Sequence, residues 1–112
     1  MSAGTYNLVV DQGSSFALDL IIKQSGAALN LTNYTGRAQL RTSHSAGSAA
    51  ASFTVTKTNA SGGALKLELS PATTAGLAAG QYVYDLEIYT ASDAIVKRIL
   101  QGEVTLTPEV TR

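Results

Sequence analysis

The stretch LAAGQYVYDLEI, residues 77–88, decides the fold of this 112-residue chain. Its second half alternates strictly between two sets of residues. One set is apolar or aromatic and the other is partly charged; they are Tyr82, Tyr84, Leu86 and Ile88 against Val83, Asp85 and Glu87. Such alternation has the period of a β-strand and predicts a strand with one buried face.

The start of this strand predicts a tyrosine corner, in which a ring packs inward while its hydroxyl bonds to the backbone a few residues upstream. Tyr82 fits the position, Gly80 would allow a tight approach, and Leu77 would close the bottom of the core. An unpaired buried hydroxyl costs on the order of 1–3 kcal/mol, so the phenol needs that partner. An ordinary core aromatic remains the other interpretation of Tyr82.

The same period of two recurs along the chain, for example in FALDLII from Phe16 and LKLEL from Leu65. Turn-forming segments such as DQGS, NASGG and TASD separate the runs. Seven strands are expected, near residues 5–10, 15–23, 36–42, 51–57, 63–69, 81–90 and 94–107.

One segment departs from the pattern. In SPATTAGLAAG, Ser70 is suited to cap a helix and Pro71 to occupy its first position. We therefore expect an all-β fold, an Ig-like antiparallel β-sandwich of about seven strands, with one short helical turn before the sixth strand. A single domain would cover residues 1–112, with short arms at both termini.

Composition restricts the function classes. Charged residues make up 14% of the chain, whereas about 25% is ordinary for a soluble domain. A surface of small uncharged residues suits contact with neighbouring subunits, although it also suits a plain solvated sandwich. Eight basic and eight acidic residues cancel, so we expect no nucleic-acid partner. No stretch is apolar for long enough to span a membrane, and no cysteine is present.

The third, sixth and seventh strands are expected to share a sheet, as in other Ig-like sandwiches. Their outward residues would be Arg37, Gln39, Arg41, Asp85, Glu87, Lys97, Gln101 and Glu103. Arginines opposite acids on neighbouring strands would form complementary pairs. A solvated charged face is the alternative to a binding site.

Catalytic residues are hard to find. The single histidine, His44, lies in a Gly/Ser/Ala loop without an orienting partner. Asp85 and Glu87 share a strand face, but a flat sheet face is not the cleft that paired carboxylates need. The acids are too scattered for a calcium site. From these residues we expect no enzyme, no metal and no cofactor.

Four motifs, taken in order and spacing, resemble a known family. They are Asp11, Gly13 and Phe16; Leu31, Thr32 and Tyr34; Gly80, Tyr82, Tyr84, Asp85, Leu86 and Glu87; and Gly102, Val104, Leu106, Pro108, Val110 and Thr111. The chain resembles a small Ig-like domain of tailed bacteriophages, including the N-terminal domain of the upper baseplate protein family. Those larger proteins continue into further domains, so a stand-alone virion subunit is expected here.

The resemblance implies a structural component of a phage virion, assembled in the host cytoplasm. A tail or baseplate adaptor, a capsid decoration or cement protein, and a carbohydrate-binding host-attachment module are the alternatives. Partners would be other virion proteins and further copies of the chain. The candidate interface residues are Tyr6, Arg37, Arg41, Asp85, Glu87, Pro108, Val110 and Arg112.

Overall fold

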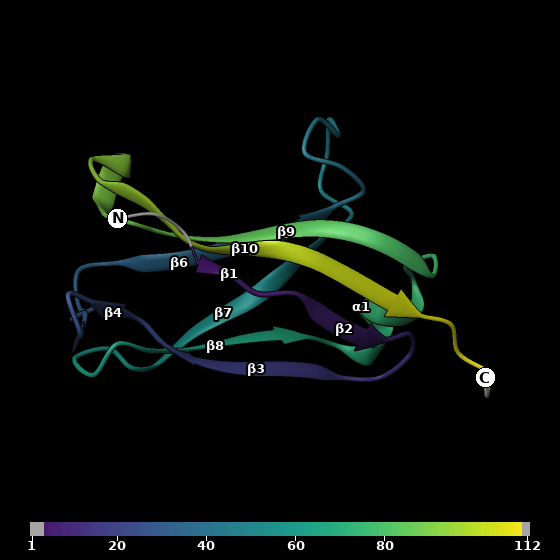
Figure 1. Cartoon of the computed structure of the whole chain (residues 1–112), viewed down its shortest axis with the longest axis horizontal. Helices are drawn as coiled ribbons and strands as arrows, with labels where there is room; N and C mark the ends of the chain where they lie inside the picture. The colour runs from purple at the N-terminus through teal and green to yellow at the C-terminus, as the bar shows by residue number, and fades with distance from the viewer. Residues whose placement is uncertain (1–3, 111–112) are drawn as a thin grey trace.

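The computed structural model describes residues 4–110 and has the expected all-β fold (Figure 1). Within these residues the strands are β1 (Gly4–Thr5), β2 (Leu8–Asp11), β3 (Phe16–Ile21), β4 (Lys23–Gln24), β5 (Ala27–Ala28), β6 (Thr35–Arg41), β7 (Ala51–Asn59), β8 (Ala64–Leu69), β9 (Gly80–Tyr89) and β10 (Val96–Thr107). The helix α1 (Pro71–Ala75) precedes β9, and a 3-10 turn, η1 (Ala91–Asp93), follows it. The seven expected strands correspond to β1 with β2, and to β3, β6, β7, β8, β9 and β10.

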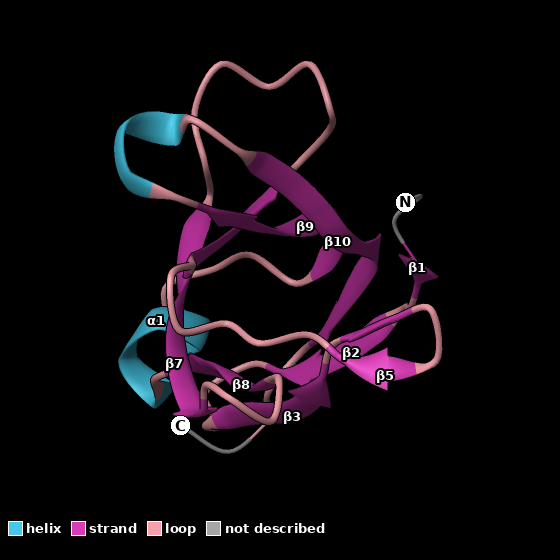
Figure 2. Ribbon diagram, turned by 90° about the vertical axis from the view of Figure 1, so that its left-hand side faces the viewer, coloured by secondary structure: helices cyan, strands magenta, loops and turns pink. Residues whose placement is uncertain are grey.

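The layers are joined into a half-barrel, which corrects the expected two-sheet sandwich. The strand order is β1-β10-β9-β6-β7-β8-β3, and β2 also pairs with β10. The reason lies in β7, whose first residues pair with β6 while the residues from Thr54 onward pair with β8. One strand therefore passes from the upper layer to the lower one, as Figure 2 shows at its left-hand side.

Among residues 4–110, two strand pairs are parallel, which corrects the expected all-antiparallel pairing. Both β1 and β2 run parallel to β10, with Gly4 opposite Leu100 and Val104 opposite Leu8. The N-terminal residues from Gly4 onward thus belong to the sheet and do not form the expected arm. The expected third, sixth and seventh strands do lie side by side, as β6, β9 and β10.

Helix α1 begins and ends as the sequence indicates. The side chain of Ser70 accepts a hydrogen bond from the backbone N–H of Thr73 at 3.2 Å, and Pro71 occupies the first turn. The hydroxyl of Thr74 is fully buried and donates to the carbonyl oxygen of Ser14 at 2.8 Å. This bond fixes the short helix against the turn between β2 and β3.

The core lies between the two layers and is filled from alternating strand positions. Its members are apolar or aromatic and nearly inaccessible to water, with Leu40, Leu67 and Leu86 fully buried. Gly36 lets the side chain of Val55 in β7 pack closely against β6, because a Cβ at Gly36 would lie 2.5 Å from Cγ1 of Val55. Burial of this apolar surface is the main favourable contribution to folding.

Candidate functional site

The outer face of β6, β9 and β10 carries most of the charged side chains that the sequence places in an interface. We call it the polar face; its residues are Arg37, Gln39, Arg41, Asp85, Glu87, Arg98 and Gln101. Strand register aligns Arg37 with Glu87 and Gln39 with Asp85. Paired residues of neighbouring strands point to the same side of a sheet, so the register brings the four predicted residues Arg37, Arg41, Asp85 and Glu87 together.

Arg37 is held by three groups at one end of the polar face. Its Nε lies 2.9 Å from Oε1 of Glu87, and its Nη1 lies 3.6 Å from Oδ1 of Asp93. Its guanidinium also covers the ring of Tyr89, 4.3 Å from the ring centre. The hydrogen bond to Glu87 raises the pKa of Arg37 above its ordinary value. The charge of Arg37 is therefore matched within the protein.

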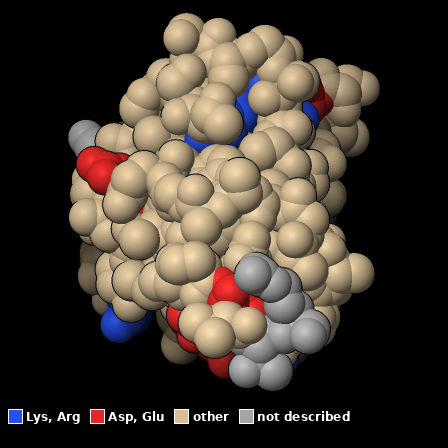
Figure 3. Space-filling view, turned by 90° about the vertical axis from the view of Figure 1, so that its right-hand side faces the viewer, with Lys and Arg blue, Asp and Glu red and all other residues tan. Residues whose placement is uncertain are grey.

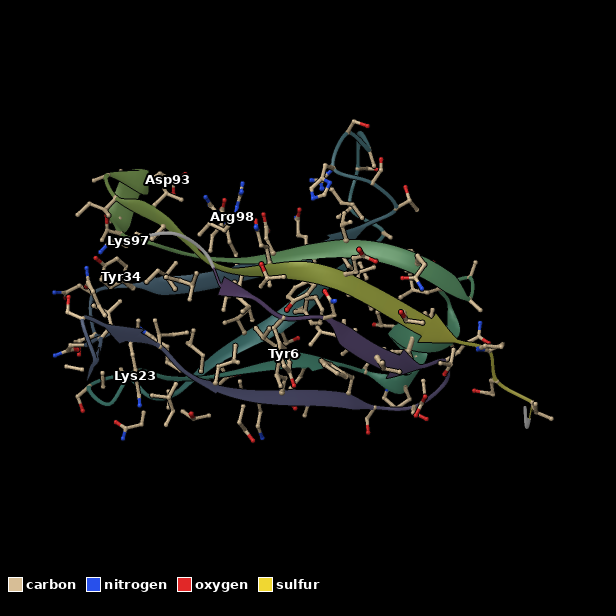
Figure 4. The ribbon with its side chains drawn as sticks, in the orientation of Figure 1. Tyr6, Lys23, Tyr34, Asp93, Lys97 and Arg98 are labelled. Atoms are coloured by element: carbon tan, nitrogen blue, oxygen red, sulfur yellow. The ribbon has the colours of Figure 1, made fainter. Side chains whose placement is uncertain are left out.

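Arg98, and not the expected Lys97, belongs to the polar face. The register between β9 and β10 shifts between Arg98 and Leu100, and this bulge reverses which residues point outward. Arg98 Nε lies 3.4 Å from Oδ2 of Asp85. Lys97 points to the other side, with its Nζ 5.7 Å from the ring centre of Tyr34 (Figure 4).

Arg41 ends β6 below the loop of residues 42–50. Its Nη1 donates to the carbonyl oxygen of Ala46 at 2.9 Å, and its Nη2 donates to Oε1 of Gln39 at 3.0 Å. Both acceptors are uncharged. Among residues 4–110, no carboxylate lies within salt-bridge distance of this guanidinium. Arg41 therefore differs from Arg37 and Arg98, because its charge has no acidic partner there.

The polar face is hollowed, which corrects the expectation of a flat sheet surface. The 42–50 loop rises from the outer side of the sheet (Figure 1). Beside it lies a hollow of about 260 Å³, lined by Gln39, Arg41, His44, Val83, Tyr84, Asp85, Arg98 and Gln101. A second, more open hollow extends along Arg37 and Glu87. Figure 3 shows basic side chains set back in a recess near the top of a mostly uncharged surface.

The residues of the tyrosine corner lie together at the start of β9. The hydroxyl of Tyr82 donates to the carbonyl oxygen of Ala78 at 2.6 Å, the bond that the tyrosine-corner interpretation expects. Leu77 packs against the core. Gly80 has a φ of 147°, and a Cβ there would meet nothing within 4 Å. The glycine is therefore needed for its backbone conformation and not for the expected close approach.

A second tyrosine contact was not expected from the sequence. The hydroxyl of Tyr84 donates to the carbonyl oxygen of Tyr6 at 2.5 Å, across the core side of β10. Gly102 makes room for this segment, since a Cβ there would lie 2.3 Å from the same oxygen. Gly102 thus marks a close approach of two backbones, and the bulge of β10 lies at Ile99.

Gln12 joins the corner to the C-terminal segment, and no sequence pattern singles it out. Its Nε2 donates to the carbonyl oxygen of Leu77 at 2.8 Å, and its Oε1 accepts from the backbone N–H of Glu109 at 3.0 Å. The carboxylate of Glu109 lies where a Cβ of Gly13 would stand. The chain is therefore held against the body as far as Glu109.

The remaining predicted interface residues lie away from the polar face. Tyr6 lies between β1 and β2 and is half exposed. Pro108 follows the end of β10, and Val110 is 91% exposed. Arg112 lies outside the described residues. The structure thus divides the predicted interface among the polar face, Tyr6 between β1 and β2, and the segment after β10 that holds Pro108 and Val110.

In the part of the chain that the structure describes, no three His, Cys, Asp or Glu side chains are grouped so that they could hold a metal ion. Within the same residues, no helix has the length and hydropathy needed to cross a bilayer.

No family model matches this chain, and no curated protein matches it. Among solved structures, the chain is similar to a family 123 glycoside hydrolase from Clostridium perfringens that was studied for glycolipid glycan hydrolysis. The identity is 12%, the TM-score is 0.47, and the match covers 100% of this chain but 24% of that one.

This finding contradicts the expectation that the chain is no enzyme. We withdraw that expectation, since missing motifs in one sequence do not exclude catalysis. The likeness is too distant to assign any activity to this chain.

Proposed function

We propose that this chain is a docking subunit of a tailed-phage virion, placed in the tail or baseplate, where it binds other virion proteins and further copies of itself. The observation that carries the proposal is the free edge of strand β3. Natural monomers protect such edges with lysines, prolines or bulges, because an unpaired strand invites another chain to pair with it.

Strand β3 contains no lysine, proline or bulge, and Asp19 is its one charged residue. It pairs with β8 on one side, and within residues 4–110 no strand pairs with its other side. Its core-facing residues Phe16, Leu18 and Leu20 are half-buried, and Ile21 is 63% exposed. An extended segment of a neighbour could add to this edge and cover the apolar side chains, while its backbone groups pair with those of β3.

The virion context comes from the resemblance of the four sequence motifs to phage Ig-like domains. The low fraction of charged residues supports the same proposal, since it leaves wide uncharged surfaces for neighbours. Repeated docking of one edge onto a different surface of the next copy would build a ring or a filament.

The test compares two exposed isoleucines. Ile21→Lys places a charge on the β3 edge, whereas Ile95→Lys makes the same change beside η1, away from that edge. Tagged versions of both would be expressed in host cells that produce the phage particles, and their occupancy in purified particles measured by mass spectrometry. We expect the wild type and Ile95→Lys in particles and Ile21→Lys strongly depleted, with both variants folded by circular dichroism.

Gold-labelled antibody against the tag separates the placements. Label on tails supports the proposal, while label on heads would assign the chain to capsid decoration. Absence of the wild-type chain from particles would refute a virion role. Equal occupancy of the two variants would refute docking through β3.

A further inference from the structure

We propose that the hollow beneath the 42–50 loop binds a small hydroxylated carboxylic acid of monosaccharide size, such as a hexuronic acid, with its carboxylate on Arg41. This inference does not rest on the virion proposal. It follows from the charge of Arg41, which has no acidic partner among residues 4–110, and from the polar lining and the size of the hollow.

Arg41 supplies the site for the carboxylate. A guanidinium has five N–H donors in one plane, and two of them can donate to the two oxygens of a carboxylate in a bidentate pair. The bonds to Ala46 and Gln39 use one donor on each of its Nη atoms and neutralise no charge. The same bonds fix the guanidinium at the wall of the hollow, so a ligand need not immobilise a free side chain.

The other charges in the hollow cancel each other. Arg98 and Asp85 both line it, and their side chains lie 3.4 Å apart. The exposed His44 adds a group that can donate or accept a hydrogen bond. Within the described part of the chain, the charge in the hollow that has no acidic partner is therefore positive, which selects an anion over a cation.

The rest of the lining suits hydroxyl groups. Gln39 and Gln101 carry amides that donate and accept, and Asp85 adds a carboxylate that accepts. A polyhydroxylated ring offers alternating donors and acceptors to such a wall. An acidic peptide is disfavoured for two reasons. Asp85 would repel a second carboxylate, and Val83 is the one aliphatic side chain in the lining against which apolar side chains of a peptide could pack.

The volume of the hollow limits the size of the ligand. The hollow measures about 260 Å³, just below the roughly 300–1,000 Å³ of sites for drug-sized molecules. It lies between the loop and the sheet, with Arg41 and Arg98 contributed by separate strands. One sugar ring with its carboxylate matches this space.

His44 gives a clean signal for the test, because it is the only histidine in the chain. The imidazole resonances of the full-length protein would be followed by NMR while sodium glucuronate is added at constant pH and ionic strength. Glucose tests the need for the carboxylate, acetate tests the need for the ring, and a glutamate-rich peptide tests the alternative source of carboxylate. We expect saturable shifts with glucuronate alone.

Variants of opposite expected effect then locate the site. Arg41→Gln should weaken glucuronate binding by about tenfold or more, because a charge-assisted hydrogen-bond pair is lost. Asp85→Asn should tighten it, because a repelling charge is removed. Lys23→Gln removes a charge from the opposite layer (Figure 4) and should leave binding unchanged. If Arg41→Gln does not fold, Arg41→Lys replaces it and should still bind more weakly, since lysine lacks the planar donor pair.

Four results would overturn the proposal: no saturable shift with glucuronate, equal binding of acetate, tighter binding of the peptide, or equal affinity of Arg41→Gln and wild type. Weaker binding by Asp85→Asn would overturn the assignment of Asp85 as a group that repels the carboxylate of the ligand.

Discussion

The two faces of strand β9 are built by different interactions. On the inner face, Tyr82, Tyr84, Leu86 and Ile88 are buried, and both tyrosine hydroxyls donate to backbone carbonyls. On the outer face, the carboxylates of Asp85 and Glu87 form salt bridges with Arg98 and Arg37, and all four side chains are partly exposed to solvent. The inner face therefore contributes stability, while the outer face can exchange its partners for a ligand at little cost to the fold.

Removal of a buried side chain from the inner face should have the largest effect. Leu86→Ala leaves a cavity at a position with no exposure to solvent, and we expect a loss of about 2–5 kcal/mol in the free energy of unfolding. Urea denaturation followed by circular dichroism measures it. Val83→Ala, on the outer face of the same strand, should cost about 1 kcal/mol or less. Similar losses in the two variants would abolish the contrast between the faces.

Removal of the Tyr84 hydroxyl should have an intermediate effect that depends on pH. Tyr84→Phe loses the bond to the carbonyl of Tyr6, and we expect about 1 kcal/mol less stability at pH 7. Tyr82→Phe is the matched control, since it loses the comparable bond to Ala78. An unchanged denaturation midpoint in Tyr84→Phe would show that this bond contributes no net stability.

The pH dependence follows from burial, which raises the pKa of Tyr84 from 10.0 to about 12. Between these values the folded protein binds the proton more tightly than the unfolded chain does. The stabilisation is therefore complete below pH 10 and is lost as the pH rises toward 12. The difference in stability between wild type and Tyr84→Phe should shrink over this range in urea titrations. A constant difference would contradict the shift.

Removal of an ion pair from the outer face should have the smallest effect. Arg37 and Glu87 are partly exposed, with 45% and 27% of their side-chain surfaces accessible. A double-mutant cycle of Arg37→Gln and Glu87→Gln should give a coupling energy of about 0–1 kcal/mol that falls as salt is added. A coupling near 3 kcal/mol would mean that the polar face also supports the fold.

Local rules account for the parts of the fold that the sequence predicted. The alternation around Leu86 and Leu67 predicts strands, and Ser70 with Pro71 predicts the start of a helix. Both depend on residues close together in the chain. The outward positions of Arg37, Arg41, Asp85 and Glu87 followed from the same period of two.

The candidate site was predicted only in part, because its shape depends on long-range contacts. The strand period predicted an outward position for Arg41, but the loop beside it and the bulge that brings Arg98 to Asp85 depend on how distant strands align. The role of Gln12 likewise appears only when residues 77 and 109 reach it.

By itself, the sequence determined which segments become strands, which face of each is buried, and where the short helix begins, because these follow from side-chain period and capping chemistry between near neighbours. Tertiary structure alone decided that β7 joins the layers into a half-barrel, that β1 and β2 run parallel to β10, and that Arg41 lies in a hollow without an acidic partner among the described residues. These outcomes depend on strand register and on backbone approach between residues far apart in the chain, as at Gly102 and Tyr6, which no local pattern encodes.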